Sequence, residues 1–157
     1  MNEKKILGIL IILSIFFSSC GFKKVNNTNN KNIYIKEISI QGDKRTSYLL
    51  KNQILLISSP EGKNKIKLKL KISKTKTVDN KNKQGRTNKY LLSIVVNLTA
   101  DDIADERLFE RKFQKKISYY VAKNHSDTID LEKESFESLK NLIADEITNF
   151  IKLYFKK

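Results

Sequence analysis

The sequence predicts an α+β fold, a two-layer sandwich in which two helices cover one face of a four-stranded, mainly antiparallel sheet. Aliphatic residues and lysines alternate without exception over residues 65–72, which is the period of a half-buried strand. Apolar residues recur three and four positions apart between residues 136 and 154, which is the period of an amphipathic helix. The remaining segments complete the element order β-α-β-β-β-α.

The first strand and the first helix are predicted at the beginning of the globular part. Residues 33–40 are mostly β-branched or aromatic, which predicts a strand, and their apolar phase shifts midway, which indicates a β-bulge. A helix is expected over residues 44–57, where apolar residues share one face, and Asp43 and Thr46 are its alternative N-caps. The segment Ser-Ser-Pro-Glu-Gly then ends the helix.

Three further strands complete the predicted sheet. The alternating segment 65–72 leads to a polar hairpin connection at residues 79–86. Residues 88–99 form the next strand, whose apolar residues on both faces predict a central position, and residues 107–122 form the last strand. The lysines expected on the helix-free face are Lys65, Lys67, Lys69 and Lys71, with Lys112 and Lys116 beside them.

The last predicted element is a long helix. A polar loop is expected over residues 123–128, and Asp130 is predicted to cap a helix that continues to about Tyr154. This helix carries one broad apolar stripe, which can cover a sheet. The stripe comprises Phe136, Leu139, Ile143, Ile147, Phe150, Ile151 and Tyr154.

The composition excludes several classes of protein. The chain has 157 residues, of which 39% are hydrophobic, enough for one folded domain but not for a multi-span membrane protein. One cysteine and one histidine exclude a disulfide framework and a Cys/His zinc site, and five glycines leave no glycine-rich phosphate loop. His125 has no partner of catalytic type nearby, and the acidic turn at 100–106 lacks the pattern of a calcium loop. We therefore expect no enzyme activity, no cofactor and no metal site.

The charge of the chain is strongly positive. Lys and Arg number 31 against 17 Asp and Glu, which gives +14, and only four of the basic residues are Arg. Such a balance suggests an anionic partner, and lysine suits diffuse rather than bidentate contact with anions. A bias of genome composition toward Lys, Asn and Ile is the alternative origin of this charge. A nucleic-acid partner is not expected, because no aromatic-rich basic motif of the RNA-binding type is present.

The first twenty residues determine the expected compartment. Two lysines precede an apolar run that is too short to span a bilayer but typical of a signal peptide. The run ends in Phe-Ser-Ser-Cys, which resembles the lipobox of bacterial lipoproteins. On that resemblance, residues 1–19 are a signal peptide, and Cys20 carries acyl chains that anchor the protein to a membrane. The alternatives are an uncleaved anchor or a secreted protein with a free thiol. Residues 20–32 then comprise the lipidated cysteine and a polar tether, before a single domain at 33–157.

Six short segments along the chain carry a resemblance to a known family. They are Cys20-Gly21-Phe22 at the predicted mature start, Gly42-Asp43 after the first strand, Leu-Lys-Asn-Gln-Ile at 50–54, Gly85-Arg86-Thr87 in the hairpin, Tyr90-Leu91 in the third strand, and Ala122-Lys123 after the fourth. In order and spacing they resemble LptE, also called rare lipoprotein B, a family of outer-membrane lipopolysaccharide-assembly lipoproteins. The chain departs from this family in its Lys/Asn-rich tether and its very basic second strand.

The resemblance implies an assembly role without catalysis. Members of the family plug the outer-membrane β-barrel LptD, help it to fold, and bind lipopolysaccharide during its delivery to the outer leaflet. For this chain, the resemblance implies an LptD-type barrel and lipopolysaccharide as partners. It also implies an outer-membrane location on the periplasmic side, through the lipid on Cys20. By position, Lys83, Arg86 and Lys123 are the expected lipopolysaccharide-binding residues. The alternative function is a generic outer-membrane or periplasmic lipoprotein that acts as a protein-interaction module.

Overall fold

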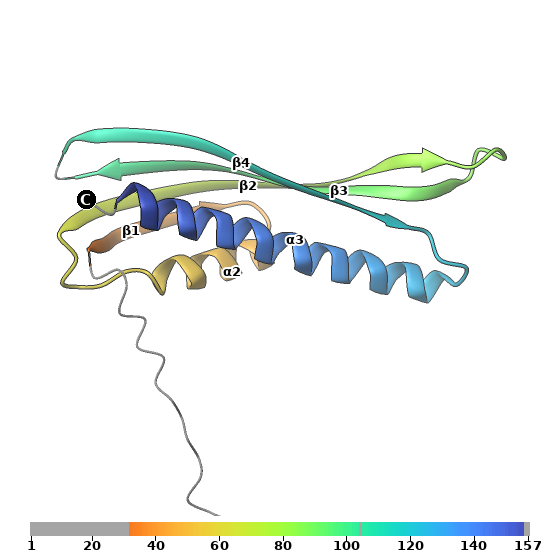
Figure 1. The fold of residues 1–157 in the computed structure, drawn as a ribbon, viewed down its shortest axis with the longest axis horizontal. Coiled ribbons are helices and arrows are strands. Elements are labelled where there is room, and N and C mark those ends of the chain that lie inside the picture. The colour runs from red at the N-terminus through yellow and green to blue at the C-terminus, as the bar shows by residue number, and fades with distance from the viewer. Residues whose placement is uncertain (1–31, 104, 156–157) are drawn as a thin grey trace, which may run out of the picture.

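Four strands form one sheet in the order β1-β2-β3-β4, and two helices lie against one of its faces (Figure 1). The computed structural model describes residues 32–103 and 105–155; the predicted signal peptide and Cys20 lie outside the described residues. The β1–β2 pair is parallel and the other two pairs are antiparallel, which confirms the predicted fold class and element order. The elements are β1 (Ile33–Gln41), α2 (Lys44–Leu55), β2 (Asn64–Lys81), β3 (Thr87–Asp102), β4 (Arg107–Tyr120) and α3 (His125–Tyr154).

The predicted bulge and the first helix are both present. The register between β1 and β2 shifts between Ile35 and Glu37, as the phase of the apolar residues predicted. Asp43 is the N-cap of α2, because its Oδ1 accepts hydrogen bonds from the backbone N–H of Thr46 (2.9 Å) and from the Thr46 hydroxyl (2.6 Å). The helix ends at Leu55, two residues before the predicted end.

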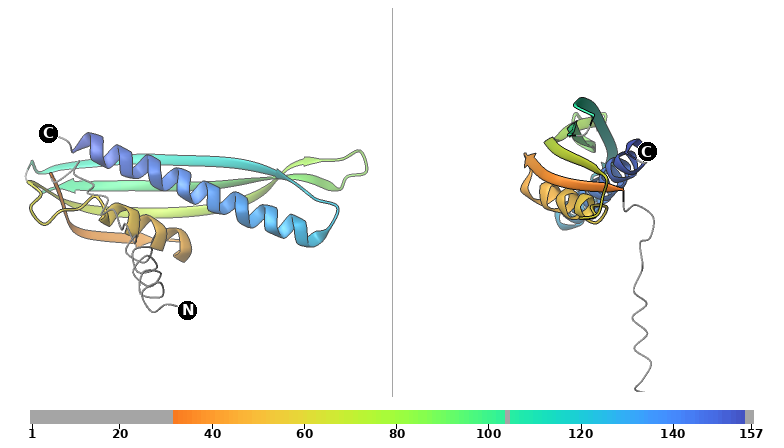
Figure 2. Two further views of the ribbon diagram at one scale, coloured as in Figure 1. Left: turned by 60° about the horizontal axis from the view of Figure 1, so that its bottom comes forward. Right: turned by 90° about the vertical axis from the view of Figure 1, so that its left-hand side faces the viewer.

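The hairpin formed by β2 and β3 is longer than predicted. β2 continues to Lys81, so the predicted connection at 79–86 shrinks to a turn that begins at Asn82. The Asn82 Oδ1 accepts hydrogen bonds from the backbone N–H groups of Gln84 (3.0 Å) and Arg86 (2.9 Å), which close this turn. The hairpin therefore extends beyond the N-terminal end of α3, as Figure 1 and the left view of Figure 2 show.

The prediction for the start of the last helix was wrong. α3 begins at His125, five residues before the predicted cap Asp130, and its N-cap residue is Asn124. The Asn124 side chain makes no capping bond to the helix; it donates to Asp127 Oδ2 (3.1 Å). The Thr128 hydroxyl instead accepts from the backbone N–H of Ala122 (3.0 Å), which holds the short link after β4 against the first turn of α3.

The hydrophobic core lies between the sheet and the two helices. The aliphatic residues of the alternating segment point to the helices, and the lysines between them are exposed. β3 lies between β2 and β4, which confirms its predicted central position. The fully buried side chains from the sheet and helices include Ile33, Leu50, Ile54, Ile66, Leu70, Leu92, Ile94, Leu98, Leu139, Ile143, Ile147 and Ile151.

Candidate anion-binding surface

The helix-free face of the sheet carries a group of lysines, which we call the basic face. Successive side chains along a strand point to opposite sides of the sheet. In β2 the buried aliphatic residues alternate with lysines, so these lysines all lie on the helix-free side. The strand register puts two lysines of β4 on this same side. The basic face comprises Lys65, Lys67, Lys69 and Lys71 of β2 with Lys112 and Lys116 of β4, all of which are exposed.

Only some of the lysines on the basic face have a carboxylate in a neighbouring cross-strand position. The register places Lys67 between two carboxylates, Glu37 on β1 and Asp101 on β3. Lys69 and Lys71 have no carboxylate in the opposed positions. Their cross-strand neighbours are Ser39 and Thr99 for Lys69, and Gln41 and Asn97 for Lys71. Glu110 on β4 ends the row of Lys69 and accepts a hydrogen bond from the Thr99 hydroxyl (3.4 Å), whereas Lys112 on β4 ends the row of Lys71. The positive charge is therefore least balanced around Lys71 and Lys112.

The three predicted lipopolysaccharide-binding residues lie at one end of the sheet. Lys83 and Arg86 belong to the turn between β2 and β3, and Lys123 follows β4; all three are exposed. The backbone N–H of Val121 donates to the carbonyl oxygen of Asn88 (3.0 Å), so the link that contains Lys123 starts beside the base of the hairpin. We call this part of the molecule the tip end.

Exposed apolar side chains at the tip end were missed by sequence reasoning. Val78 is 48% exposed, Tyr120 is 65% exposed and Val121 is 39% exposed. The ammonium of Lys89 lies 5.5 Å from the centre of the Tyr120 ring and 2.9 Å from Asp79 Oδ2. That hydrogen-bonded ion pair raises the pKa of Lys89 and lowers the pKa of Asp79. The tip end therefore combines cations with exposed apolar surface. In the sequence, Tyr120 close to Lys123 was the residue that could have indicated it.

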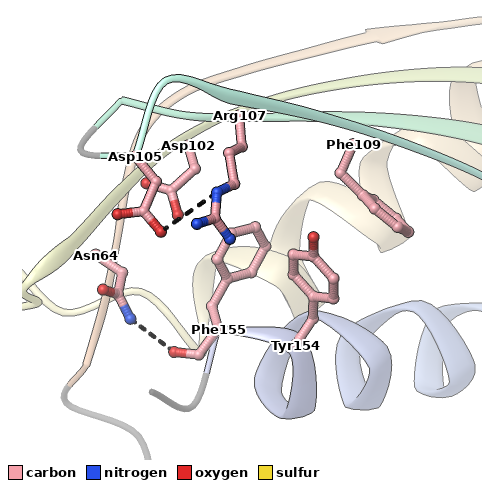
Figure 3. A pocket seen from close by; sticks show the side chains of 7 residues that line it. All are labelled: Asn64, Asp102, Asp105, Arg107, Phe109, Tyr154 and Phe155. Atoms are coloured by element: carbon pink, nitrogen blue, oxygen red, sulfur yellow. Dashed lines mark hydrogen bonds and ion pairs between the residues drawn. The ribbon is translucent and has the colours of Figure 1, made fainter.

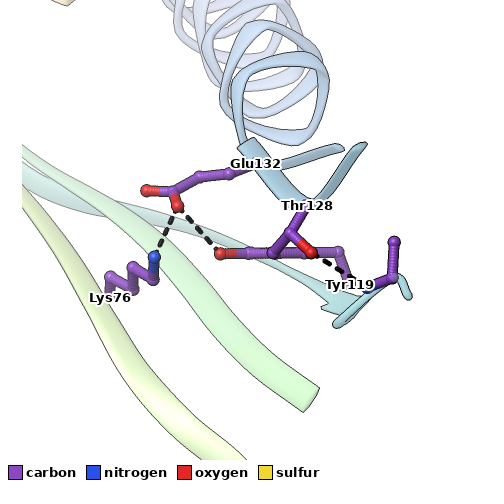
Figure 4. A network of polar contacts seen from close by, with 5 residues as sticks. Lys76, Tyr119, Thr128 and Glu132 are labelled. Carbon is purple, nitrogen blue, oxygen red and sulfur yellow. Dashed lines mark hydrogen bonds and ion pairs between the residues drawn. The ribbon is translucent and has the colours of Figure 1, made fainter. Parts of the chain in front are cut away.

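A polar network fastens the first half of α3 to the sheet just below the tip end (Figure 4). Glu132 accepts hydrogen bonds from the ammonium of Lys76 on β2 and from the Tyr119 hydroxyl on β4 (2.9 Å). Although partial burial opposes ionisation of the carboxyl group, these hydrogen bonds lower the pKa of Glu132. Partial burial also opposes the charge on Lys76, yet its bonds to Glu132 and Tyr119 raise the pKa of this lysine.

A small pocket of about 140 Å³ lies at the opposite end of the sheet (Figure 3). The Asn64 side-chain N–H donates to the carbonyl oxygen of Phe155 (2.7 Å), which ties the end of α3 to the start of β2. Arg107 lies 3.9 Å from Asp105, beside the rings of Tyr154 and Phe155. These contacts close the end of the core, and we assign no ligand to this pocket.

The described residues offer neither a metal site nor a membrane-spanning helix. Within 32–103 and 105–155, no group of three or more His, Cys, Asp or Glu side chains is placed to hold a metal ion. None of the helices in that part of the chain combines the length and the apolarity needed to cross a membrane. The isolated histidine, His125, is exposed at the first position of α3.

Comparison with solved structures identifies the fold. No protein-family model and no curated protein sequence matches the chain. The crystal structure of rare lipoprotein B from Shewanella oneidensis aligns with a TM-score of 0.54 and 16% identity, over 73% of this chain and 92% of that one. The solution structure of an uncharacterized lipoprotein B from Nitrosomonas europaea aligns with a TM-score of 0.60 and 10% identity, over 81% and 89%. At these identities the likeness concerns the fold, and the chain therefore has the fold of rare lipoprotein B, the LptE fold.

Proposed function

We propose that the chain is a lipid-anchored lipopolysaccharide-assembly protein of the outer membrane, on its periplasmic side. In this role it plugs an LptD-type β-barrel, helps it to fold, and binds lipopolysaccharide on its way to the outer leaflet. The observation that carries the proposal is the LptE fold behind a segment that resembles a lipobox at Cys20. The proposed role needs no catalytic group and no cofactor.

The two faces of the sheet suit enclosure by a barrel. The helices bury the apolar side of the sheet, so the side left for a partner is polar and positively charged. The lumen of an outer-membrane barrel is also polar, because its apolar residues face lipid. The charged and hydrogen-bonding side chains of the basic face can contact such a wall.

The tip end suits an amphiphile that carries phosphate groups. Lys83, Arg86 and Lys123 can neutralise phosphates, and lysine contributes point charges that tolerate variable geometry. The exposed side chains of Val78 and Tyr120 offer apolar contact beside them. This combination supports lipopolysaccharide as the ligand rather than a free phosphate ion.

Co-purification from membranes in mild detergent tests the function. We expect the tagged chain to recover a large β-barrel protein in stoichiometric amount. If the host cell makes an LptD-type barrel and the chain recovers none of it, the proposed function is wrong. Recovery of a different envelope protein in stoichiometric amount would support the alternative, a generic lipoprotein interaction module.

Charge reversal tests the assignment of the binding residues. The variant K83E/R86E/K123E should weaken binding to purified lipopolysaccharide at least tenfold and leave the circular dichroism spectrum unchanged, since all three side chains are exposed. The control K36E/K51E/K63E changes the net charge equally at exposed positions outside the tip end. If the two variants bind lipopolysaccharide equally well, the assignment of Lys83, Arg86 and Lys123 as binding residues is wrong, while the fold assignment still holds.

A further inference from the structure

The three most exposed leucines of the described residues lie at one end of the molecule. Leu56 is 76% exposed, Leu108 is 68% exposed and Leu153 is 72% exposed. They come from three separate elements: the turn after α2, the start of β4 and the last turn of α3. This end, which we call the leucine end, lies opposite the tip end (Figures 1 and 2).

Hydrogen bonds tie the start of the described chain to the leucine end. The backbone N–H of Ser59, just after Leu56, donates to the carbonyl oxygen of Ile33 (2.8 Å). The backbone N–H of Asn64 donates to the carbonyl oxygen of Asn32 (2.8 Å), and the Asn64 side chain holds the end of α3. The described chain therefore begins at the leucine end.

The distance to Cys20 limits which surface can meet a membrane. Eleven residues separate Cys20 from Asn32, and even fully extended they span at most about 40 Å. α3 has 30 residues and is therefore about 45 Å long, and the tip end lies beyond its first residue. The link from Asn32 to Cys20 is shorter than this distance, so it cannot run back along the domain and place the acyl chains at the tip end. Acyl chains on Cys20 would hold the leucine end nearest to the bilayer, at a high effective concentration.

We propose that the leucine end docks on the membrane surface and inserts Leu56, Leu108 and Leu153 among zwitterionic phospholipids. The inference rests on the lipid anchor of the proposed function and adds a second contact to it. Tyr154, 43% exposed beside Leu153, supplies an aromatic ring of the kind enriched at membrane interfaces. Asp105 and Glu106 in the β3–β4 turn are balanced by Arg107 beside Leu108 and by Lys152 beside Leu153, so this end has little net charge and gains little from an anionic surface. The contact is therefore apolar and insensitive to salt, although the chain as a whole carries +14.

Single-tryptophan reporters test this contact, because the chain contains no tryptophan. The full mature chain, purified from membranes, is placed in phosphatidylcholine–phosphatidylethanolamine vesicles whose acyl chains carry bromine, a fluorescence quencher. The L153W and L56W reporters should be quenched at least twofold, at low and at high salt. The Y120W reporter at the tip end, with a similar starting exposure of 65%, should keep its fluorescence.

Mutations within the leucine end provide the second arm. The pair L108S/L153S should remove most of the quenching of the L56W reporter, whereas L131S/L142S, at exposed positions elsewhere on α3, should leave it unchanged. Mass spectrometry of the same sample reports whether Cys20 is acylated. An acylated chain whose L153W and L56W reporters are no more quenched than Y120W overturns the membrane contact and leaves the anchor standing. A mature chain without acyl groups overturns both.

Discussion

Gly42 shows how one residue fixes the turn from β1 into α2. Its φ is 122°, a conformation that side chains rarely adopt, and a Cβ built on it would lie 2.2 Å from the carbonyl oxygen of Ile72. Gly85 in the hairpin turn also has a positive φ, 78°, but open space around it. Substitution of Gly42 would cause both steric overlap and backbone strain, whereas substitution of Gly85 would cause backbone strain alone.

We expect Gly42→Ala to lower the free energy of unfolding by roughly 3 kcal/mol or more, since strain and overlap add. Gly85→Ala should cost only about 1–2 kcal/mol, because strain acts alone. Urea denaturation of both variants measures the difference. Equal losses would mean that the close approach of Gly42 to β2 does not exist in solution.

Asp43 couples the capping of α2 to pH. Hydrogen bonds from the Thr46 side chain and backbone lower the pKa of the carboxyl group from its usual value of 3.8. A depressed pKa in the folded state stabilises the protein above the unfolded value, and this stability is lost as the pH falls through the folded value. The unfolded chain binds the proton first, so acid removes the contribution of the cap.

We therefore expect the free energy of unfolding to fall more steeply below pH 3.8 for the native chain than for Asp43→Asn, which keeps a capping oxygen but cannot titrate. At neutral pH, Asp43→Ala should lose about 1 kcal/mol. Urea titrations over a pH series measure both quantities. Parallel pH profiles for the native chain and Asp43→Asn would show that the carboxylate does not act as the cap.

At the scale of elements, the Glu132 network explains how α3 can begin so close to the tip end. Glu132 is the common acceptor for Lys76 on β2 and Tyr119 on β4, so one side chain joins three elements. The C-terminal half of α3 is held differently, by aromatic contacts such as Phe109 with Phe150, whose ring centres are 5.2 Å apart. The two halves should therefore respond independently to mutation.

Glu132→Ala should accelerate amide hydrogen exchange in residues 125–135 by roughly tenfold, because loss of the acceptor costs about 1–2 kcal/mol locally. Exchange in the C-terminal half of α3 should not change. Glu134→Ala, at an exposed position on the same helix, is the control and should have little effect. Uniform acceleration along the whole helix would refute the division into two halves.

The same elements show what sequence could predict. The alternation at 65–72 predicted both the strand and its two faces, because period two has one structural meaning when one side is buried. It could not predict the extension of β2 to Lys81, since the helix-facing positions after Ile72 become Lys74 and Lys76. Those lysines are accommodated by long-range contacts, Lys74 over the Phe136 ring (3.7 Å) and Lys76 with Glu132.

The wrong start of α3 has a similar cause. A carboxylate at Asp130 predicts a cap at that position, but the chain reverses immediately after β4 and the helix begins at His125. The Thr128 hydroxyl accepts the backbone N–H of Ala122, so packing of the reversal, rather than a local cap, determines the first turn. Lys83, Arg86 and Lys123 were chosen by position alone, and only the tertiary structure places them at one end of the sheet.

At the scale of the whole molecule, charge and apolar surface are distributed along the long axis. The tip end carries the cations chosen for lipopolysaccharide, the basic face lies along the helix-free side, and the leucine end is where the chain leads back toward Cys20. The proposed function assigns lipopolysaccharide to the tip end and the barrel wall to the basic face, and the proposed membrane contact assigns the bilayer to the leucine end. The tip end and the leucine end lie at opposite ends of the sheet, so lipopolysaccharide and the bilayer can be bound in one orientation. The basic face meets the leucine end at Lys65 and Leu108, where the barrel wall and the bilayer would adjoin.

Site-specific photocrosslinking in living cells tests the central claim, enclosure of the basic face by a barrel. A photoreactive residue at Lys71, in the middle of the basic face, should form an adduct with an LptD-type barrel. The same residue at Glu61, in the turn after α2 near the leucine end, should crosslink to that barrel much less. Strong barrel adducts from Lys71 are the predicted result; a barrel that co-purifies but crosslinks only from Glu61 would contradict the account.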